Sequence, residues 1–179
     1  SSLTLNKSRK MKILHYLRSV RREDGGVVRV VLDHCRMMAS CNHEVRLATV
    51  EPLDVPQDWR GRAGHTPQII DLSGSLVFGS ILNKRARRLL EDQMLMADII
   101  YLHEIWRPEN IQLGHIARRC RKPYVVPIYG MLDPWATRQK RIKKTIYHAL
   151  AGKSLLEGAR YLQCTSSEEQ VKARIWAPM

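Results

Sequence analysis

"ADIIYLHEIWRPENIQLGHIARRCRKPYVVPIYG", residues 97–130, contains two apolar runs separated by a polar segment. The first run, residues 97–102, and the last, residues 123–129, are typical of buried strands. Pro108 suits the first turn of a helix, and the polar segment predicts a helix that continues to about Arg121. Strand, helix and strand in this order are typical of two parallel strands joined by a right-handed crossover. The stretch therefore predicts an α/β fold.

The same alternation continues on both sides of this stretch. Further strands are predicted at residues 12–17, 43–50, 68–72 and 160–165, and further helices at residues 27–40, 80–96, 138–150 and 166–176. Residues 51–67 contain three prolines and two glycines and predict a loop. The pattern predicts a three-layer α/β/α domain whose parallel sheet is covered on both faces. The strands at residues 12–17, 98–102 and 124–128 are expected in the centre of that sheet.

The helix at residues 27–40 is expected to bury one apolar face. The positions assigned to that face are Val27, Val30, Val31, Cys35 and Met38. Asn42 follows where a left-handed residue commonly ends a helix. In the last helix, Ser166 or Ser167 is expected to be the N-cap.

Length and composition indicate a single globular domain. The chain has 179 residues, 44% of them hydrophobic, which excludes wholesale disorder. No apolar run approaches the roughly 18 residues that a membrane-spanning helix needs. Residues 1–10 are polar and are interpreted as a leader or a cloning remnant before a domain at residues 11–179. The four cysteines have no metal-site spacing, so reduced thiols in the cytoplasm are expected.

A net charge of +13 and a pI of about 10.0 predict an anionic partner. Basic residues gather in three runs, at residues 84–88, 118–122 and 138–144. Solvated helix faces are the simplest interpretation of such runs. The third run has Ile142 and Ile146 beneath its basic rim and could instead lie on an acidic membrane. Nucleic acid is the less favoured partner, because the aromatic residues stand mostly in apolar contexts.

Three unusual loops follow predicted strands: "RREDGG", "HEIW" and "YGMLDPW". They converge if those strands are neighbours, since ligands of open α/β sheets bind beyond the carboxyl ends of the strands. Gly25 and Gly26 would let a phosphate approach a helix N-terminus, although a flexible turn is an equal interpretation. His103 ends a strand, where a histidine is usually a hydrogen-bonded structural residue.

Four stretches resemble the amino-terminal domain of the retaining family 4 glycosyltransferases. They are "EDGGVVRVVLDHCRMMASCNHEVRLATV", "ADIIYLHEIWRPEN", "KPYVVPIYGMLDPWATRQKRIKKTIYHAL" and "GARYLQCTSSEEQ", and the resemblance covers residues 11–178. It implies one half of a B-type glycosyltransferase, an enzyme with two Rossmann-like domains facing across a cleft. The amino-terminal domain binds the acceptor in that family, and the other domain binds the nucleotide-sugar donor. The donor domain would be absent from this chain, and the fragment alone is expected to be inactive.

The resemblance also implies roles for single residues. Gly25 and Gly26 match a glycine loop near the donor phosphates, and His103 matches a histidine at the end of the fourth strand. Tyr129 stands where the family commonly has a histidine that points toward the transferred sugar. With an ordinary pKa of about 10, a tyrosine is no base at neutral pH, so no catalytic residue is assigned. Glu169 matches a structural acid at a helix start.

In the loop after Tyr129, Asp133 is expected to cap or brace the chain and Trp135 to be buried beneath it. No metal and no cofactor are expected, because the nucleotide sugar is a co-substrate.

The leading hypothesis is therefore a hexosyl-type transferase that moves a sugar to an acceptor hydroxyl with retention of configuration. The acceptor would be a sugar or a lipid-linked molecule. The location would be cytoplasmic, with peripheral contact at the inner membrane face as an open possibility. One alternative is a non-catalytic basic module that binds nucleic acid or anionic lipid. Another is one half of a two-domain sugar epimerase.

Overall fold

The computed structural model describes residues 9–61, 65–131 and 152–176. These residues form a six-stranded sheet in the order β3-β2-β1-β6-β7-β8, and every pairing in it is parallel. The strands are β1 (Lys12–Tyr16), β2 (Glu44–Thr49), β3 (Gln68–Asp71), β6 (Ile99–Leu102), β7 (Tyr124–Pro127) and β8 (Tyr161–Gln163). The predicted parallel sheet is confirmed, and β1, β6 and β7 are neighbours inside it.

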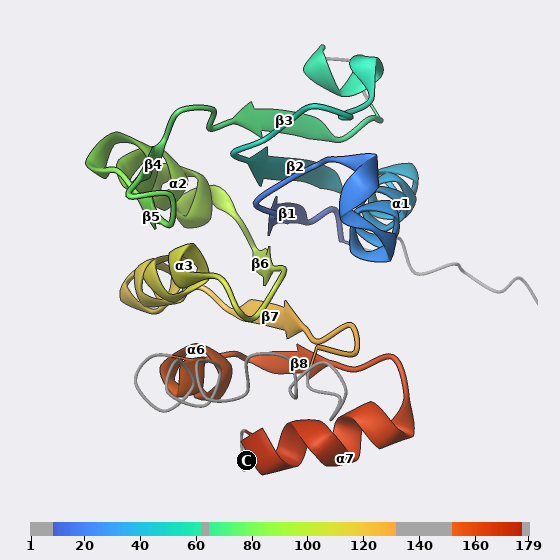
Figure 1. Ribbon diagram of the computed structural model, residues 1–179. Coiled ribbons are helices and arrows are strands. Elements are labelled where there is room, and N and C mark those ends of the chain that lie inside the picture. The colour runs from blue at the N-terminus through green and yellow to red at the C-terminus, as the bar shows by residue number, and fades with distance from the viewer. Residues whose placement is uncertain (1–8, 62–64, 132–151, 177–179) are drawn as a thin grey trace, which may run out of the picture.

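Helices cover both faces of the sheet (Figure 1). They are α1 (Gly26–Ser40), α2 (Lys84–Met96), α3 (Pro108–Arg119), α6 (Lys153–Glu157) and α7 (Ser167–Trp176), with short 3₁₀ turns η1 (Arg22–Asp24) and η2 (Gln57–Arg60). In Figure 1, α1 lies on one side of the sheet, and α2, α3 and α6 lie on the other. The three-layer Rossmann-like α/β/α architecture is therefore confirmed.

Alternate residues of β1 explain why the sheet needs a helix layer on each face. Ile13 packs into the cluster that contains α1, whereas Leu14 and Tyr16 pack into the cluster that contains α2 and α3. All three are at most 5% exposed. A strand that is apolar on both faces stays out of water only in the middle of a covered sheet.

The buried face of α1 differs from the prediction. Its buried residues are Val28, Val31, Leu32, Cys35 and Ala39. Val30 is 48% exposed, so its assignment to the buried face was wrong. In a segment with four valines within five residues, helical spacing fits two neighbouring phases, and only packing against the sheet selects one. Asn42 has φ 69°, which confirms the predicted left-handed residue after the helix.

A small antiparallel hairpin precedes α2 where a helix was predicted from Ser80. It consists of β4 (Leu76–Val77) and β5 (Ile81–Leu82). The helix begins only at Lys84, because Asn83 Oδ1 accepts a hydrogen bond from Ala86 N (2.9 Å) and caps it. The hairpin, η2 and α6 were not predicted. The predicted helix at residues 138–150 lies outside the described residues.

Candidate functional site

The three loops that the sequence singles out leave the same edge of the sheet. β1, β6 and β7 are hydrogen-bonded neighbours, with Tyr16 opposite Leu102 and Tyr101 opposite Val125. Because parallel strands end at one edge, the segments after these three strands converge there. The predicted convergence is confirmed for the described part of the third loop, which ends at Met131.

Aromatic rings from these strands stack into one group, here called the ring cluster. It contains His15 of β1, Tyr101 of β6, His103 and Tyr129, with His34 of α1 edge-on against it. Ring centroids lie 4.7 Å apart for His15 and Tyr101, 5.3 Å for His15 and His103, and 5.9 Å for His103 and Tyr129. The interplanar angles in these three pairs are 15° or less. The cluster joins three strand ends beneath α1.

Hydrogen bonds connect the ring cluster from its surface to its core. Tyr129 Oη lies 3.3 Å from His103 Nδ1, and His103 Nε2 lies 3.0 Å from His15 Nδ1. A neutral imidazole has one donor and one acceptor nitrogen. When the Tyr129 hydroxyl donates to His103 Nδ1, His103 Nε2 therefore donates to His15 Nδ1. In the other arrangement both bonds are reversed, so that His15 donates to His103 and His103 donates to Tyr129. Within the described chain His15 Nε2 is buried without a partner, so the row of bonds ends there.

Burial keeps the ring cluster uncharged. Burial, together with nearby His34, lowers the pKa of His103 to about 3. Burial followed by His103 and His34 holds the pKa of His15 well below its ordinary value. Burial also raises the pKa of the Tyr129 phenol, with smaller contributions from Cys35 and Tyr101. At neutral pH both imidazoles are neutral and the phenol keeps its proton, so Tyr129 does not act as a base.

The backbone at Tyr129 is held by a buried acid. Tyr129 and Gly130 both have left-handed backbones, with φ of 49° and 71°. Gly130 N donates to Glu169, whose side chain also accepts from Thr165 N and, at 2.9 Å, from Thr165 Oγ1. Glu169 is 3% exposed and joins the loop after β7 to the loop before α7. Ser166 Oγ accepts from Glu169 N (3.1 Å), as expected for the predicted N-cap.

The predicted site residues fall into two groups. His103 and Tyr129 are in contact, but His103 is fully buried and Tyr129 is half-buried. Gly25 (φ 96°) and Gly26 form the N-terminus of α1 and border a surface hollow of about 710 Å³. Among the described residues, the lining of that hollow includes neither His103 nor Tyr129.

The hollow beside Gly25 and Gly26 suits an anion. Arg22, Arg29 and Arg36 contribute to its lining, as do the carboxylates Asp33 and Asp54. Asp33 faces Arg36 at 3.7 Å, and Asp54 Oδ2 accepts from Arg22 N (2.7 Å). Gly25 caps α1 without a side chain, and a Cβ on Gly26 would meet no atom within 4 Å. A helix N-terminus with accessible N–H groups and nearby guanidinium groups is a favourable place for a phosphate.

A second polar group lies at the same edge and was not predicted. Arg18 pairs with the fully buried Glu109 (3.2 Å), and Arg107 pairs with Glu104 (2.9 Å). Asn110 Nδ2 donates to the carbonyls of His103 and Glu104. These bonds stabilise the loop between β6 and α3, in which Glu104 has φ 68°. Two features of the sequence could have indicated the residues that were missed: the acid Glu109 in the first turn of α3, and the histidine His15 within an apolar strand.

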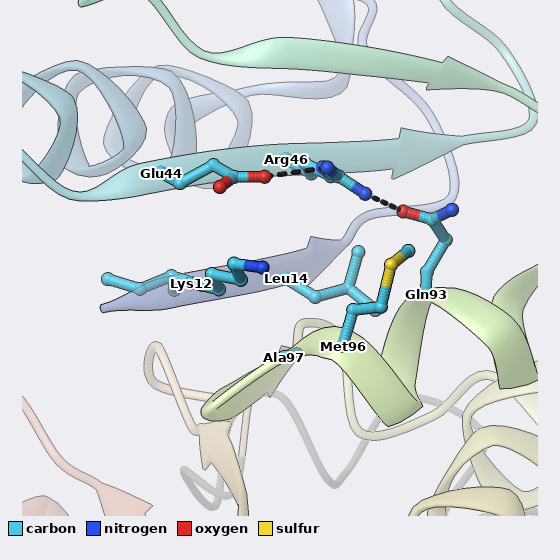
Figure 2. Close-up of a pocket in the computed structure, with 8 residues that line it drawn as sticks. Lys12, Leu14, Glu44, Arg46, Gln93, Met96 and Ala97 are labelled. Atoms are coloured by element: carbon cyan, nitrogen blue, oxygen red, sulfur yellow. Dashed lines mark hydrogen bonds and ion pairs between the residues drawn. The ribbon is translucent and has the colours of Figure 1, made fainter. Parts of the chain in front are cut away.

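The opposite edge of the sheet has a hollow that is too small for a substrate. Figure 2 shows Arg46 of β2 between Glu44 and Gln93, with Lys12 and Met96 beside them. Arg46 Nη2 donates to Glu44 (2.6 Å) and Nη1 donates to Gln93. The hollow holds about 10 Å³, which is at most one water molecule. It lies at the amino ends of β1 and β2 and is a structural contact.

Two kinds of site are absent from the described residues. No group of three or more His, Cys, Asp or Glu side chains there could hold a metal ion. No helix in the same residues has the length and apolar character to cross a membrane. All four cysteines are free thiols.

Two solved structures share this fold at low sequence identity. Anabaena HepE in complex with UDP and glucose is 13% identical with a TM-score of 0.61, over 93% of this chain and 41% of HepE. HepE in complex with UDP-glucose is 13% identical with a TM-score of 0.60, over 93% of this chain and 40% of HepE. No protein-family model matches the chain, and a search of curated proteins finds no match. The chain shares the Rossmann-like fold of part of HepE and spans about two fifths of its length.

Proposed function

We propose that this chain is the acceptor-binding half of a glycosyltransferase. The full enzyme would transfer a hexosyl group from a nucleotide donor to an acceptor hydroxyl with retention of configuration. The observation that carries the proposal is the edge where three loops converge on Tyr129, whose hydroxyl is held by His103. The fold supports it, because about two fifths of HepE has the same fold and HepE was solved with UDP-glucose.

In this proposal Tyr129 contacts the sugar and His103 does not. The half-exposed phenol ring offers a flat face for stacking and a hydroxyl for one hydrogen bond. His103 is fully buried, so its role is to orient Tyr129 through the bond to Nδ1. Gly25 and Gly26 would bring backbone N–H groups to the donor diphosphate when a second domain closes over the edge.

Catalysis would then come from electrostatics and positioning. The α1 N-terminus and the arginines beside it stabilise the negative charge that develops on the leaving diphosphate. The ring cluster holds Tyr129 in one orientation, so that the acceptor meets the donor in a fixed geometry. No strong base is assigned, since the ring cluster is neutral and Tyr129 keeps its proton.

A transfer assay tests this proposal. A protein that carries both halves should transfer labelled hexose from a nucleotide sugar such as UDP-glucose, and NMR of the product should show a retained anomeric configuration. The 179-residue chain alone should transfer none. Transfer by the chain alone would contradict the half-enzyme assignment, and an inverted product would contradict retention.

The same assay addresses the sugar-epimerase alternative. An epimerase converts one nucleotide sugar into another without any acceptor. Accumulation of a second nucleotide sugar in acceptor-free samples would therefore replace the transferase proposal.

A basic anion-binding module is the second candidate function. It is favoured by the net charge of +13 and by the three arginines that line the hollow next to Gly25. A binder that acts by counterion release loses affinity steeply with salt and has no preference for sugars. Titrating UDP-glucose, UDP and a short RNA at two salt concentrations would separate the candidates.

The predicted membrane contact at residues 138–144 and the cytoplasmic location remain predictions.

A further inference from the structure

The turn of the β4–β5 hairpin places an aromatic side chain in an unfavourable position. Phe78 is the single phenylalanine of the sequence and is 93% exposed. Its backbone is left-handed (φ 50°), as is that of Gly79 (φ 69°), and Ser80 N donates to Val77 O (3.3 Å) to close the turn. Asn and Gly are favoured at such positions, and a bulky residue there is uncommon. Folding therefore does not explain a phenylalanine at this site.

Two neighbours make the turn an apolar tip. Val77 is 41% exposed and Ile81 is 45% exposed. They form a cross-strand pair directly behind Phe78. We call Val77, Phe78 and Ile81 the apolar tip, because together they present three exposed apolar side chains on one hairpin.

Cations follow the apolar tip along the chain. Lys84, Arg87 and Arg88 of α2 line a hollow of about 440 Å³ between α2 and α3, with Arg119 on the α3 side. Arg119 pairs with Glu91 (2.7 Å), whereas no ion pair joins the charged groups of the three α2 residues to any other described residue. Lys84, Arg87 and Arg88 are called here the basic rim. Lys84 and Arg87 stand in the first turn of α2, where the helix dipole disfavours positive charge. An anionic partner would remove this unfavourable interaction.

Hydrogen bonds hold the tip in a fixed place relative to the basic rim. Asn83 N donates to Ser75 O (2.8 Å), and Leu82 N donates to Gln112 Oε1 of α3 (2.9 Å). Arg18, in the loop after β1, donates to Gly79 O (2.8 Å). Figure 1 shows the hairpin beside α2, on the α2 and α3 side of the sheet. The tip is thus attached both to the hollow and to the edge with the candidate site.

We propose that the apolar tip and the basic rim dock on an anionic lipid bilayer. Phe78 enters the boundary between headgroups and acyl chains, and Lys84, Arg87 and Arg88 contact lipid phosphates. Exposed apolar side chains beside unpaired cations are the pattern of interfacial membrane binding. Nucleic acid would use the cations and could stack on Phe78, but it has no use for the exposed aliphatic chains of Val77 and Ile81. The docking itself does not depend on the proposed sugar transfer.

Vesicle co-sedimentation of the whole chain tests the proposal. The wild type should bind phosphatidylcholine vesicles that contain phosphatidylglycerol, and not vesicles of phosphatidylcholine alone. Phe78→Ser should weaken binding about tenfold, since the buried apolar ring is lost. Arg87→Glu combined with Arg88→Glu should weaken it at least about tenfold and reduce its dependence on salt.

Matched controls change equivalent groups elsewhere on the surface. Leu53 is 66% exposed, so Leu53→Ser removes an exposed apolar side chain outside the tip. Arg9→Glu combined with Lys10→Glu reverses two adjacent exposed charges. Both controls should bind as the wild type does, and thermal melts should show that every variant is folded.

Four outcomes would overturn the proposal. The first is no binding of the wild type to anionic vesicles at low salt. The second is undiminished binding by the folded Phe78→Ser variant. The third is a loss of all vesicle binding when the charges of Lys140, Lys143 and Lys144 are reversed, together with no loss of binding when the tip is changed. The fourth is that the wild type binds a short RNA as tightly as it binds anionic vesicles, and that Phe78→Ser leaves the affinity for RNA unchanged.

Discussion

Tyr129 combines an unfavourable backbone with a favourable side-chain contact. Its left-handed φ of 49° is uncommon for an aromatic residue, and the bonds from Gly130 to Glu169 and from Tyr129 to His103 hold it in place. Strained residues often mark functional positions, because the surrounding structure must be built to hold them. At the scale of single residues, the site is thus a half-exposed tyrosine supported by neutral buried histidines.

Tyr129→Phe tests the bond to His103. The change removes the hydroxyl and leaves His103 Nδ1 without its partner, which should lower the free energy of unfolding by about 1 kcal/mol. Chemical denaturation measures this loss, and the ring signals of His103 in NMR spectra should shift. His43, whose Nδ1 accepts from Met11 N, provides a control signal that should not move. An unchanged His103 signal would contradict the hydrogen bond.

The buried histidines predict a loss of stability in acid. His103 has a pKa of about 3 in the folded protein and about 6.5 in the unfolded chain, so the unfolded state binds more protons below pH 6.5. The stability that the neutral, buried His103 contributes is fully present above pH 6.5 and decreases as the pH falls toward 3. By linkage, the free energy of unfolding should decrease by about 2 kcal/mol for this residue between pH 7 and pH 5. His15, whose pKa is also lowered, adds to the decrease.

Denaturation curves at the two pH values measure this effect. His103→Gln keeps a polar side chain that does not titrate in this range. Between pH 7 and pH 5 the free energy of unfolding of this variant should therefore decrease by about 2 kcal/mol less than that of the wild type. The same pH dependence in His103→Gln and wild type would contradict the assignment to His103.

At the scale of elements, the sequence predicts long apolar segments better than short ones. β1, β6 and β7 were predicted because each is an apolar run with polar residues on either side. The β4–β5 hairpin was missed because Ile81 and Leu82 also fit the helical spacing of α2, and only the cap at Asn83 places the helix start. His15 was missed because its partner, His103, is 88 residues away and is found only through the pairing of β1 with β6.

The N-terminus of α1 supplies a prediction for this element. Gly26 has an ordinary backbone, and a methyl group at its Cα would point into open space, so Gly26→Val should fold with little change in melting temperature. In the protein with both halves it should lower donor turnover, since the side chain obstructs phosphate approach. Gly25→Ala is the contrasting variant, because φ 96° at that position makes any side chain strained. Unchanged turnover in Gly26→Val would assign the glycines to the turn alone.

At the scale of the whole molecule, the architecture separates the edge with the candidate site from an edge with structural contacts. The carboxyl edge contains Tyr129, the α1 N-terminus and buried polar groups, whereas the amino edge contains the Arg46 contacts of Figure 2. Strand alternation predicts the sheet and its edges, because parallel sheets follow few topological rules. The ring cluster requires the strand order and register, which the apolar pattern does not specify.

Donor turnover in variants of the two edges tests the central claim most directly. In a protein that carries both halves, Tyr129→Ala should lower transfer from UDP-glucose by about 10²-fold, because the acceptor loses its fixed position. Tyr129→Phe should retain most of the activity, since the neutral ring cluster takes no proton. Gln93→Ala, at the amino edge, should turn over like the wild type. Equal activity of Tyr129→Ala and Gln93→Ala would contradict a functional site at the carboxyl edge.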